Sequence, residues 1–129
     1  ALFRNAARKS VIRSILARAY PSQENVNEEL IDILHKPTKR KGAAEAFRGF
    51  INIFDDHLAT DLLSEFDKPV HLIWGELDTW EPIEEAKAWK KRYRCVESLV
   101  AIKDAGHCPH DEKPEEVNEA LINIINHKW

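Results

Sequence analysis

The stretch PVHLIWGELDTWEP, residues 69–82, decides the fold that this sequence predicts. Its first half is a short β-rich run that Pro69 opens and Gly75 stops, which is typical of a buried strand. The helical pattern EPIEEAKAWKKRY follows at once, with Pro82 in its first turn and basic residues in its last turn. A strand that leads directly into a helix is the unit of a parallel α/β sheet.

The same order of strand and helix is repeated towards the C-terminus. The run ESLVAIK, residues 97–103, predicts a second strand, which leads into the loop DAGHCPHDEK, residues 104–113. A last helix is expected to start at Pro114, with its apolar face formed by Val117, Leu121, Ile124 and Ile125. Two strands alone do not make a stable sheet with helices on both faces. We therefore expect these strands to join others, or the chain to form a homo-oligomer through exposed strand edges.

The sequence before Asp67 has helical periodicity. Four helices are expected, over residues 3–19, 25–37, 43–54 and 58–66. In the third of these, the residues expected to face inward are Ala43, Phe47, Phe50, Ile51 and Phe54. We interpret residues 1–66 as a helical segment and residues 67–129 as part of an α/β core.

Composition and charge exclude several classes of protein. The chain has 129 residues, of which 43% are hydrophobic, but its apolar runs are too short to span a bilayer. Arginines interrupt the apolar residues of the first twenty positions, which a signal peptide does not allow. The basic run KPTKRK, residues 36–41, has no recognition motif beside it, so we expect a solvated loop and no nucleic-acid partner. Cys95 and Cys108 are too few for a disulfide framework and favour reduced thiols in an intracellular protein.

Reactive side chains follow both predicted strands. Asp78 comes three residues after Gly75, and His107 comes shortly after Lys103. Functional residues of an open parallel sheet gather where its strands end, so adjacent strands would place this carboxylate beside this imidazole. A nucleophilic hydrolase needs that pairing, because the carboxylate fixes the tautomer of the histidine. Two other readings remain open, a turn aspartate that caps the next helix and a structural loop histidine.

Together, GELDTWEP and GHCPHDEKP resemble the end of an α/β-hydrolase. In that family the triad acid follows a strand in a G-x-x-D turn, and the histidine follows the next strand in a G-H motif. A Glu-x-Pro step then enters the last helix, matched here by Glu112 and Pro114. The order of acid and histidine agrees with that of the family. The resemblance implies the C-terminal half of an α/β-hydrolase fold, a helical cap segment followed by β-α-β-α, with Asp78 as acid and His107 as general base.

The stretch GHCPHDE and the Asp-x-Trp pattern are similar to pheophytinase-like hydrolases of plants and cyanobacteria. This finer resemblance implies a cap that shapes the substrate pocket, a small hydrophobic ester-type substrate, and no cofactor. It also implies a cytoplasmic location, or the plastid stroma in a plant. Trp80 is expected to form a wall of the substrate pocket, and the alternative is a core residue that seals the loop. Cys108 either lines that pocket or packs.

The nucleophile of such an enzyme is missing from this sequence. No glycine frames a serine as G-x-S-x-G, and Ser10, Ser14 and Ser22 lie in a helical region where no nucleophile elbow forms. We therefore expect the chain alone to be inactive and the other half of the core to supply a serine, or an aspartate, upstream or from a second chain. The competing hypothesis is a non-enzymatic protein-interaction module with an inherited hydrolase fold. A metal site that includes His110 is disfavoured, because ligands from separate elements are not evident.

Overall fold

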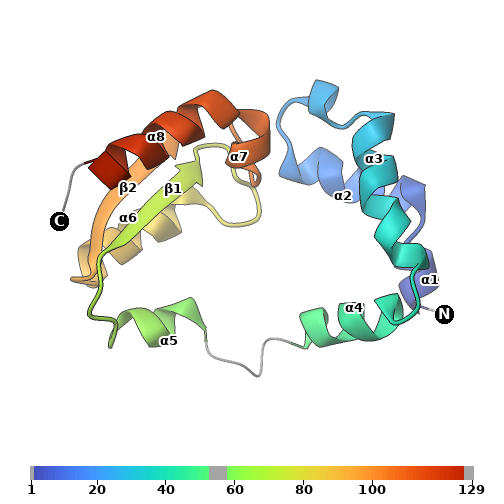
Figure 1. The fold of residues 1–129 in the computed structure, drawn as a ribbon, viewed down its shortest axis with the longest axis horizontal. Coiled ribbons are helices and arrows are strands. Elements are labelled where there is room, and N and C mark those ends of the chain that lie inside the picture. The colour runs from blue at the N-terminus through green and yellow to red at the C-terminus, as the bar shows by residue number, and fades with distance from the viewer. Residues whose placement is uncertain (1, 53–57, 127–129) are drawn as a thin grey trace.

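The computed structural model describes residues 2–52 and 58–126, which form a helical part and an α/β part (Figure 1). The helical part consists of α1 (Leu2–Ala6), α2 (Lys9–Ala19), η1 (Gln23–Asn25), α3 (Glu28–His35), η2 (Lys36–Lys39) and α4 (Ala43–Ile51). The α/β part consists of α5 (Ala59–Leu63), β1 (Val70–Gly75), α6 (Ile83–Arg92), β2 (Val96–Ile102), α7 (Pro109–Glu112) and α8 (Pro114–Asn126). Within the described ranges, none of these helices has both the length and the hydropathy needed to cross a membrane.

The helices before the sheet differ in detail from the sequence prediction. The helix expected over residues 3–19 is interrupted, because Arg8 takes an extended conformation with φ −71° and ψ 139°. The helix expected to start at residue 25 begins at Glu28, because Asn27 is its N-cap and its side chain accepts a hydrogen bond from the Leu30 N–H at 2.9 Å. Pro37 lies in η2, directly after α3. The helical segments thus lie where the periodicity places them, but their number is larger than predicted, and their ends depend on local backbone geometry.

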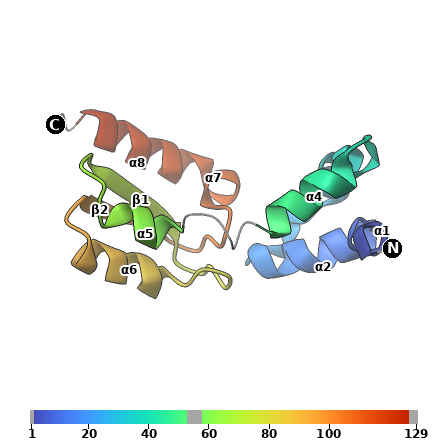
Figure 2. The same cartoon turned by 90° about the horizontal axis from the view of Figure 1, so that it is seen from below.

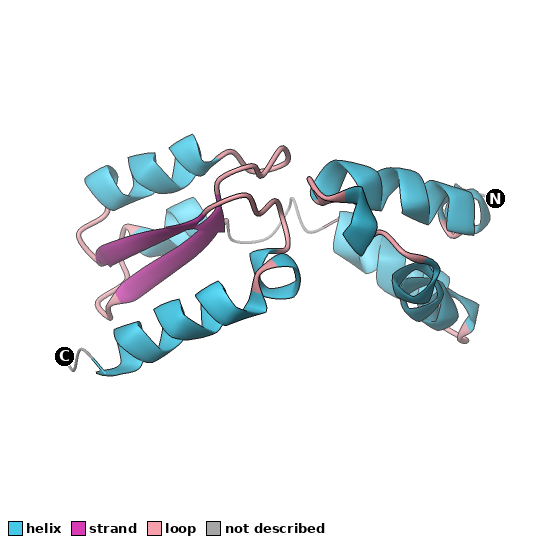
Figure 3. Ribbon diagram, turned by 90° about the horizontal axis from the view of Figure 1, so that it is seen from above, coloured by secondary structure: helices cyan, strands magenta, loops and turns pink. Residues whose placement is uncertain are grey.

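The sheet is parallel, as the strand–helix–strand order predicts. Its register runs from Val70 opposite Val96 to Gly75 opposite Ile102, with one irregularity after Val70. Helix α6 covers one face and α8 covers the other (Figure 2, Figure 3). Both strands end at the same edge of the sheet, so the loops that carry Asp78 and His107 begin next to each other.

The last helix buries a narrower face than the sequence predicts. Val117 and Ala120 are buried, but Leu121 and Ile125 are 44% and 65% exposed. A two-stranded sheet offers only a narrow surface, so one stripe of α8 is covered and the adjacent apolar side chains stay accessible. The apolar face of this helix is therefore only partly buried, and Leu121 and Ile125 remain accessible.

The inward face predicted for α4 is wrong as well. Phe50 and Ile51 are 69% and 39% exposed, and no described residue of α4 is buried. Phe47 packs against Phe3 with ring centroids 5.5 Å apart, and this contact leaves the side of α4 that carries Phe50 uncovered. Phe54 lies outside the described residues.

The helical part and the α/β part meet at the end of α2. A buried apolar cluster in the helical part consists of Leu16, Ala19, Tyr20, Val26 and Ile31. Cys108, from the loop after β2, packs against this cluster. Gly106 lies so close to α2 that an added Cβ would stand 2.3 Å from the Ala19 carbonyl oxygen. Only a glycine fits at position 106, because any Cβ would collide with the Ala19 backbone. The loop that carries His107 therefore lies directly against the helical part.

Candidate active site

Asp78 lies in the loop after β1, where that loop is fastened to the chain following β2. The Glu76 N–H donates to the Ile102 carbonyl at 3.0 Å, and the Leu77 N–H donates to the Ala105 carbonyl at 2.8 Å. These two bonds continue the pairing of the strands past the end of the sheet. The backbone before Asp78 is consequently held against the backbone that precedes His107.

The two carboxylate oxygens of Asp78 have separate partners. Oδ1 accepts hydrogen bonds from the N–H groups of Trp80 at 2.9 Å and Glu81 at 3.0 Å. Oδ2 lies 3.0 Å from Nδ1 of His107. These bonds close the turn after β1 and do not cap α6, which begins at Ile83 after Pro82 without a side-chain cap. Asp78 is therefore a turn residue that also pairs with the histidine, and the helix-capping alternative is wrong. The turn bonds hold the carboxylate with its second oxygen towards the imidazole.

Burial and hydrogen bonding act in opposite directions on Asp78. Only 6% of its side chain is exposed, against 35% for His107. This burial raises the pKa of Asp78, but the N–H groups of Glu81 and Trp80 and the His107 imidazole lower it by more, so the pKa lies below its usual value. An ionised carboxylate only accepts hydrogen bonds, so Nδ1 of His107 is the donor in this contact, and in the neutral imidazole the lone pair is on Nε2.

The backbone of His107 is also fixed. Its N–H donates to the carbonyl of Ala19, the last residue of α2, at 2.9 Å. The preceding N–H, of Gly106, donates to Oε1 of Glu112 at 2.7 Å. Successive peptides of the loop are thus held by different elements, which limits the directions that the imidazole can take.

A small cavity of about 190 Å³ opens beside the pair. It is lined by Ile73, Trp74, Gly75, Asp78, Glu81, His107 and Pro109. A larger hollow of about 600 Å³ lies on the other side of the Asp78 loop, between Glu76–Thr79 and the end of α2. Asp78 therefore borders both hollows, and His107 borders the smaller one.

Trp80 lies directly against the histidine. The two ring centroids are 4.6 Å apart with an interplanar angle of 51°, and Trp80 is 39% exposed. This position beside the imidazole is compatible with a wall for an apolar substrate. Trp74 of β1 and Trp89 of α6 pack edge to face with ring centroids 5.9 Å apart, a contact that joins the strand to the helix.

Cys108 follows the histidine but points to the helical part. It packs against the buried cluster around Tyr20, and burial raises the pKa of its thiol. Both Cys95 and Cys108 are free thiols. Packing is the role that its contacts describe, and a contribution of Cys108 to substrate binding stays a prediction.

The polar residues after the histidine have structural partners. Asp111 accepts a hydrogen bond from the Tyr20 hydroxyl at 2.8 Å, and Glu112 accepts one from Gly106. His110 is exposed. Within residues 2–52 and 58–126, no group of three or more side chains is arranged to hold a metal ion.

Three contacts that hold the site have no counterpart in the sequence prediction. Neither the Tyr20–Asp111 bond, nor the Glu112–Gly106 bond, nor the role of the Ala19 carbonyl was predicted. The Glu-x-Pro step singled out Glu112, but as a mark of the helix start rather than as a partner of the histidine loop. A backbone carbonyl carries no sequence signal at all, because every residue has one.

The sequence has measurable similarity to known hydrolases. It is 29% identical over 100 residues to an uncharacterized hydrolase, YugF, of Bacillus subtilis (strain 168), a match that covers 78% of this chain and 36% of that protein. The chain therefore spans about a third of the length of that relative.

Solved structures show the same fold. A meta-cleavage product hydrolase (CumD) superposes with a TM-score of 0.76 at 15% identity, over 94% of this chain and 46% of that one. A second structure of this hydrolase, from Pseudomonas fluorescens and complexed with acetates, gives 0.75 at 15% identity over 92% and 46%. The profile of the alpha/beta hydrolase family matches residues 2–120, which is most of the chain. The chain belongs to the α/β-hydrolase family.

Proposed function

We propose that the protein containing this chain is a serine-type α/β-hydrolase that cleaves an ester or a related carbonyl bond. Asp78 is its triad acid and His107 its general base. The observation that carries the proposal is the 3.0 Å contact between Asp78 Oδ2 and His107 Nδ1, made by loops that leave adjacent parallel strands at one edge of the sheet. The nucleophile belongs to a part of the core that precedes this chain.

The roles follow from the hydrogen bonds. Because Nδ1 donates to Asp78, Nε2 can take the proton of a serine hydroxyl as its oxygen attacks the substrate carbonyl. The imidazolium then protonates the departing alcohol, and an acyl-enzyme remains. Water attacks the acyl group and gives its proton to Nε2, after which the acid leaves and the serine regains its proton. Throughout, the ionised Asp78 stabilises the positive charge on His107.

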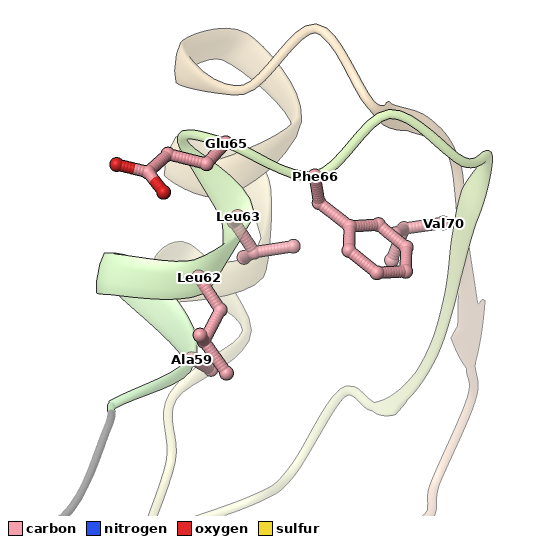
Figure 4. A pocket seen from close by; sticks show the side chains of 6 residues that line it. All are labelled: Ala59, Leu62, Leu63, Glu65, Phe66 and Val70. Atoms are coloured by element: carbon pink, nitrogen blue, oxygen red, sulfur yellow. The ribbon is translucent and has the colours of Figure 1, made fainter.

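We propose that the remaining core strands are the main partner of this chain. Among the described residues β1 pairs with β2 alone, and beside the start of β1 lies an apolar hollow of about 450 Å³ (Figure 4). Its apolar lining consists of Ala59, Leu62, Leu63, Phe66 and Val70. Leu62 and Phe66 are 53% and 50% exposed, more apolar surface than a finished sheet leaves open. Further strands along β1 would cover this hollow and bring the nucleophile towards His107.

The proposed substrate is a hydrophobic small-molecule ester with a bulky alcohol or acyl group. The ring of Trp80 beside His107 supports an apolar wall at the reacting carbonyl. The similarity of GHCPHDE to pheophytinase-like hydrolases suggests a bulky alcohol or acyl group, in a cyanobacterial or plastid setting. The ester class rests on the Asp78–His107 pair, and the size of the substrate rests on that resemblance.

A kinetic experiment on the full-length protein tests this function. Hydrolysis of p-nitrophenyl esters of increasing chain length would be compared for the wild type, His107→Ala, Asp78→Asn and His110→Ala. We expect kcat to fall by about 10³-fold or more for His107→Ala and by about 10²- to 10⁴-fold for Asp78→Asn. His110 is exposed, so His110→Ala serves as the matched control and should keep wild-type rates. Unchanged turnover in His107→Ala would refute the proposal.

The identity of the nucleophile needs a separate test. A fluorophosphonate probe forms a covalent bond with an activated serine, and labelling should require His107 because the imidazole removes the hydroxyl proton. We expect labelling of the wild type and none of His107→Ala. Turnover without labelling would point to an aspartate nucleophile, which single-turnover hydrolysis in ¹⁸O-water identifies by ¹⁸O in its carboxylate.

The exposed apolar residues also support a second candidate, an interaction module without catalysis. Phe50, Leu62 and Phe66 are each at least half exposed. On this reading Asp78→Asn and His107→Ala would leave the biological function intact. Size-exclusion chromatography with light scattering of the native protein separates the cases, since a homo-oligomer of this chain alone would favour the module and a longer monomer would favour the hydrolase.

A further inference from the structure

A half-buried carboxylate, with one oxygen shielded from solvent, lies behind the histidine loop. Glu112 ends α7, and its Oε1 accepts the Gly106 N–H at 2.7 Å. Its own N–H donates to the Cys108 carbonyl at 3.0 Å, so the loop closes on itself around His107. The side chain therefore contacts the peptide immediately before the histidine and not the imidazole itself.

The surroundings of Gly106 leave the loop little freedom. An added Cβ on Gly75 would stand 2.0 Å from the Gly106 carbonyl oxygen, and one on Gly106 would stand 2.5 Å from Cδ of Pro21. On the far side, His107 donates its N–H to Ala19. Gly75 and Pro21 confine the loop by close contact and Ala19 holds it through its backbone carbonyl, whereas Glu112 holds the Gly106 N–H through its side chain.

Holding Glu112 here has an energetic cost. Burial raises the pKa of its carboxyl, and the N–H groups of Gly106 and Cys108 lower it by less, so the pKa stays above its usual value. The folded protein thus disfavours the ionised form of this side chain. A residue kept in place against its own desolvation is typical of functional sites rather than of stabilising contacts.

We propose that Glu112 is a positioning residue for His107, which fixes the Gly106–His107 peptide and thereby directs the imidazole at Asp78. The inference deepens the proposed function and rests on it for its effect on turnover. Glu112 touches neither substrate nor the reacting atoms. Its oxygen needs only to accept a hydrogen bond, so a glutamine can replace it and an alanine cannot.

The test combines a signal of the histidine with kinetics in the full-length protein. With ¹⁵N-labelled histidine, the Nδ1 proton bound to Asp78 gives a downfield NMR resonance that Asp78→Asn should remove, which assigns it. We expect this resonance to disappear or broaden in Glu112→Ala and to persist in Glu112→Gln. In parallel, kcat should fall about 10- to 100-fold in Glu112→Ala with KM changed less than about twofold, and Glu112→Gln should restore most of the loss. Glu115→Gln, at an exposed carboxylate in the first turn of α8, is the matched control.

The outcomes separate this inference from the proposed function. If Glu112→Ala keeps both the resonance and kcat, Glu112 does not position His107 and the inference is wrong. If Glu112→Ala does not fold, Glu112→Asp replaces it, because the shorter side chain withdraws the acceptor and should broaden the same resonance. If His107→Ala keeps full esterase activity, the proposed function fails, while the NMR signal still decides whether Glu112 orients the histidine.

Discussion

The N–H of His107 donates a hydrogen bond to the carbonyl of Ala19 across 2.9 Å, which ties the proposed general base to the end of α2. The loop of the proposed acid is tied to the same turn, because the Thr79 hydroxyl donates to the Arg18 carbonyl at 2.8 Å. Two successive carbonyls at one helix end thus accept from both loops of the pair. The helical part of the chain contributes to the geometry of the site even though it supplies neither the acid nor the base.

Tyr20→Phe should destabilise the junction between the two parts. The Tyr20 hydroxyl is a donor to Asp111, and burial raises its pKa, so it stays protonated. Losing a hydrogen bond to a charged acceptor should lower the free energy of unfolding by about 1–2 kcal/mol, measured by urea denaturation. Tyr93→Phe is the matched control, since Tyr93 is similarly buried and its ring contact with Arg92 is one that a phenylalanine keeps. Equal losses in the two variants would contradict this prediction.

Gly75→Ala should destabilise the fold severely. The new Cβ would stand 2.0 Å from the Gly106 carbonyl oxygen and 2.6 Å from that of Ala105, and neither backbone can retreat without moving the histidine loop. We expect a loss of about 3 kcal/mol or more in the free energy of unfolding. Gly49→Ala is the control, because nothing lies within 4 Å of its Cβ. In the middle of a helix that change should stabilise by about 0.5–1 kcal/mol. A mild effect at Gly75 would show that the loops can separate.

Stability should depend on pH in opposite directions through two carboxylates. The folded state lowers the pKa of Asp78 below its usual 3.8, so its stabilising effect is present above that pH and is lost as the pH falls through the lowered value. It raises the pKa of Glu112 above its usual 4.5, so stability is lost as the pH rises from there through the raised value.

Substitution should remove each dependence separately. The free energy of unfolding would be measured by urea denaturation between about pH 3 and pH 7. For Asp78→Asn, it should fall less steeply towards acid pH than it does for the wild type. For Glu112→Gln, the decrease in the free energy of unfolding as the pH rises above the usual glutamate pKa of 4.5 should disappear. Parallel pH profiles of wild type and Glu112→Gln would mean that this carboxyl is not desolvated in the folded protein.

Trp80→Ala should affect substrate binding more than folding. The ring stands against His107 and is 39% exposed, so its removal takes away an apolar surface beside the base but little of the core. We expect KM for a long-chain ester to rise about five- to tenfold, with a smaller change for an acetate ester. In the control Trp89→Ala, which breaks the contact with Trp74, stability should fall and KM should stay constant. The reverse pattern would make Trp80 a core residue.

Much of the fold was predictable because its signals are local. A β-rich run between Pro69 and Gly75, followed by a helix, defines a parallel unit whatever surrounds it. Asp78 and His107 follow the two strands within a few residues, so parallel pairing alone brings them together. The predicted inward face of α4 failed, because burial depends on what lies opposite a helix, as the exposure of Phe50 demonstrates.

The sequence by itself determined the parallel pair of strands and the two residues that meet at its edge, because spacing along a strand sets where the following loop begins. Only the tertiary structure decided that the Ala19 carbonyl, the Tyr20 hydroxyl and the Glu112 carboxylate hold those loops in place. Ala19 and Tyr20 are far from the loops in sequence. The Ala19 bond and the bond from Gly106 to Glu112 also use backbone groups that every residue carries, so such contacts exist only once the chain has packed.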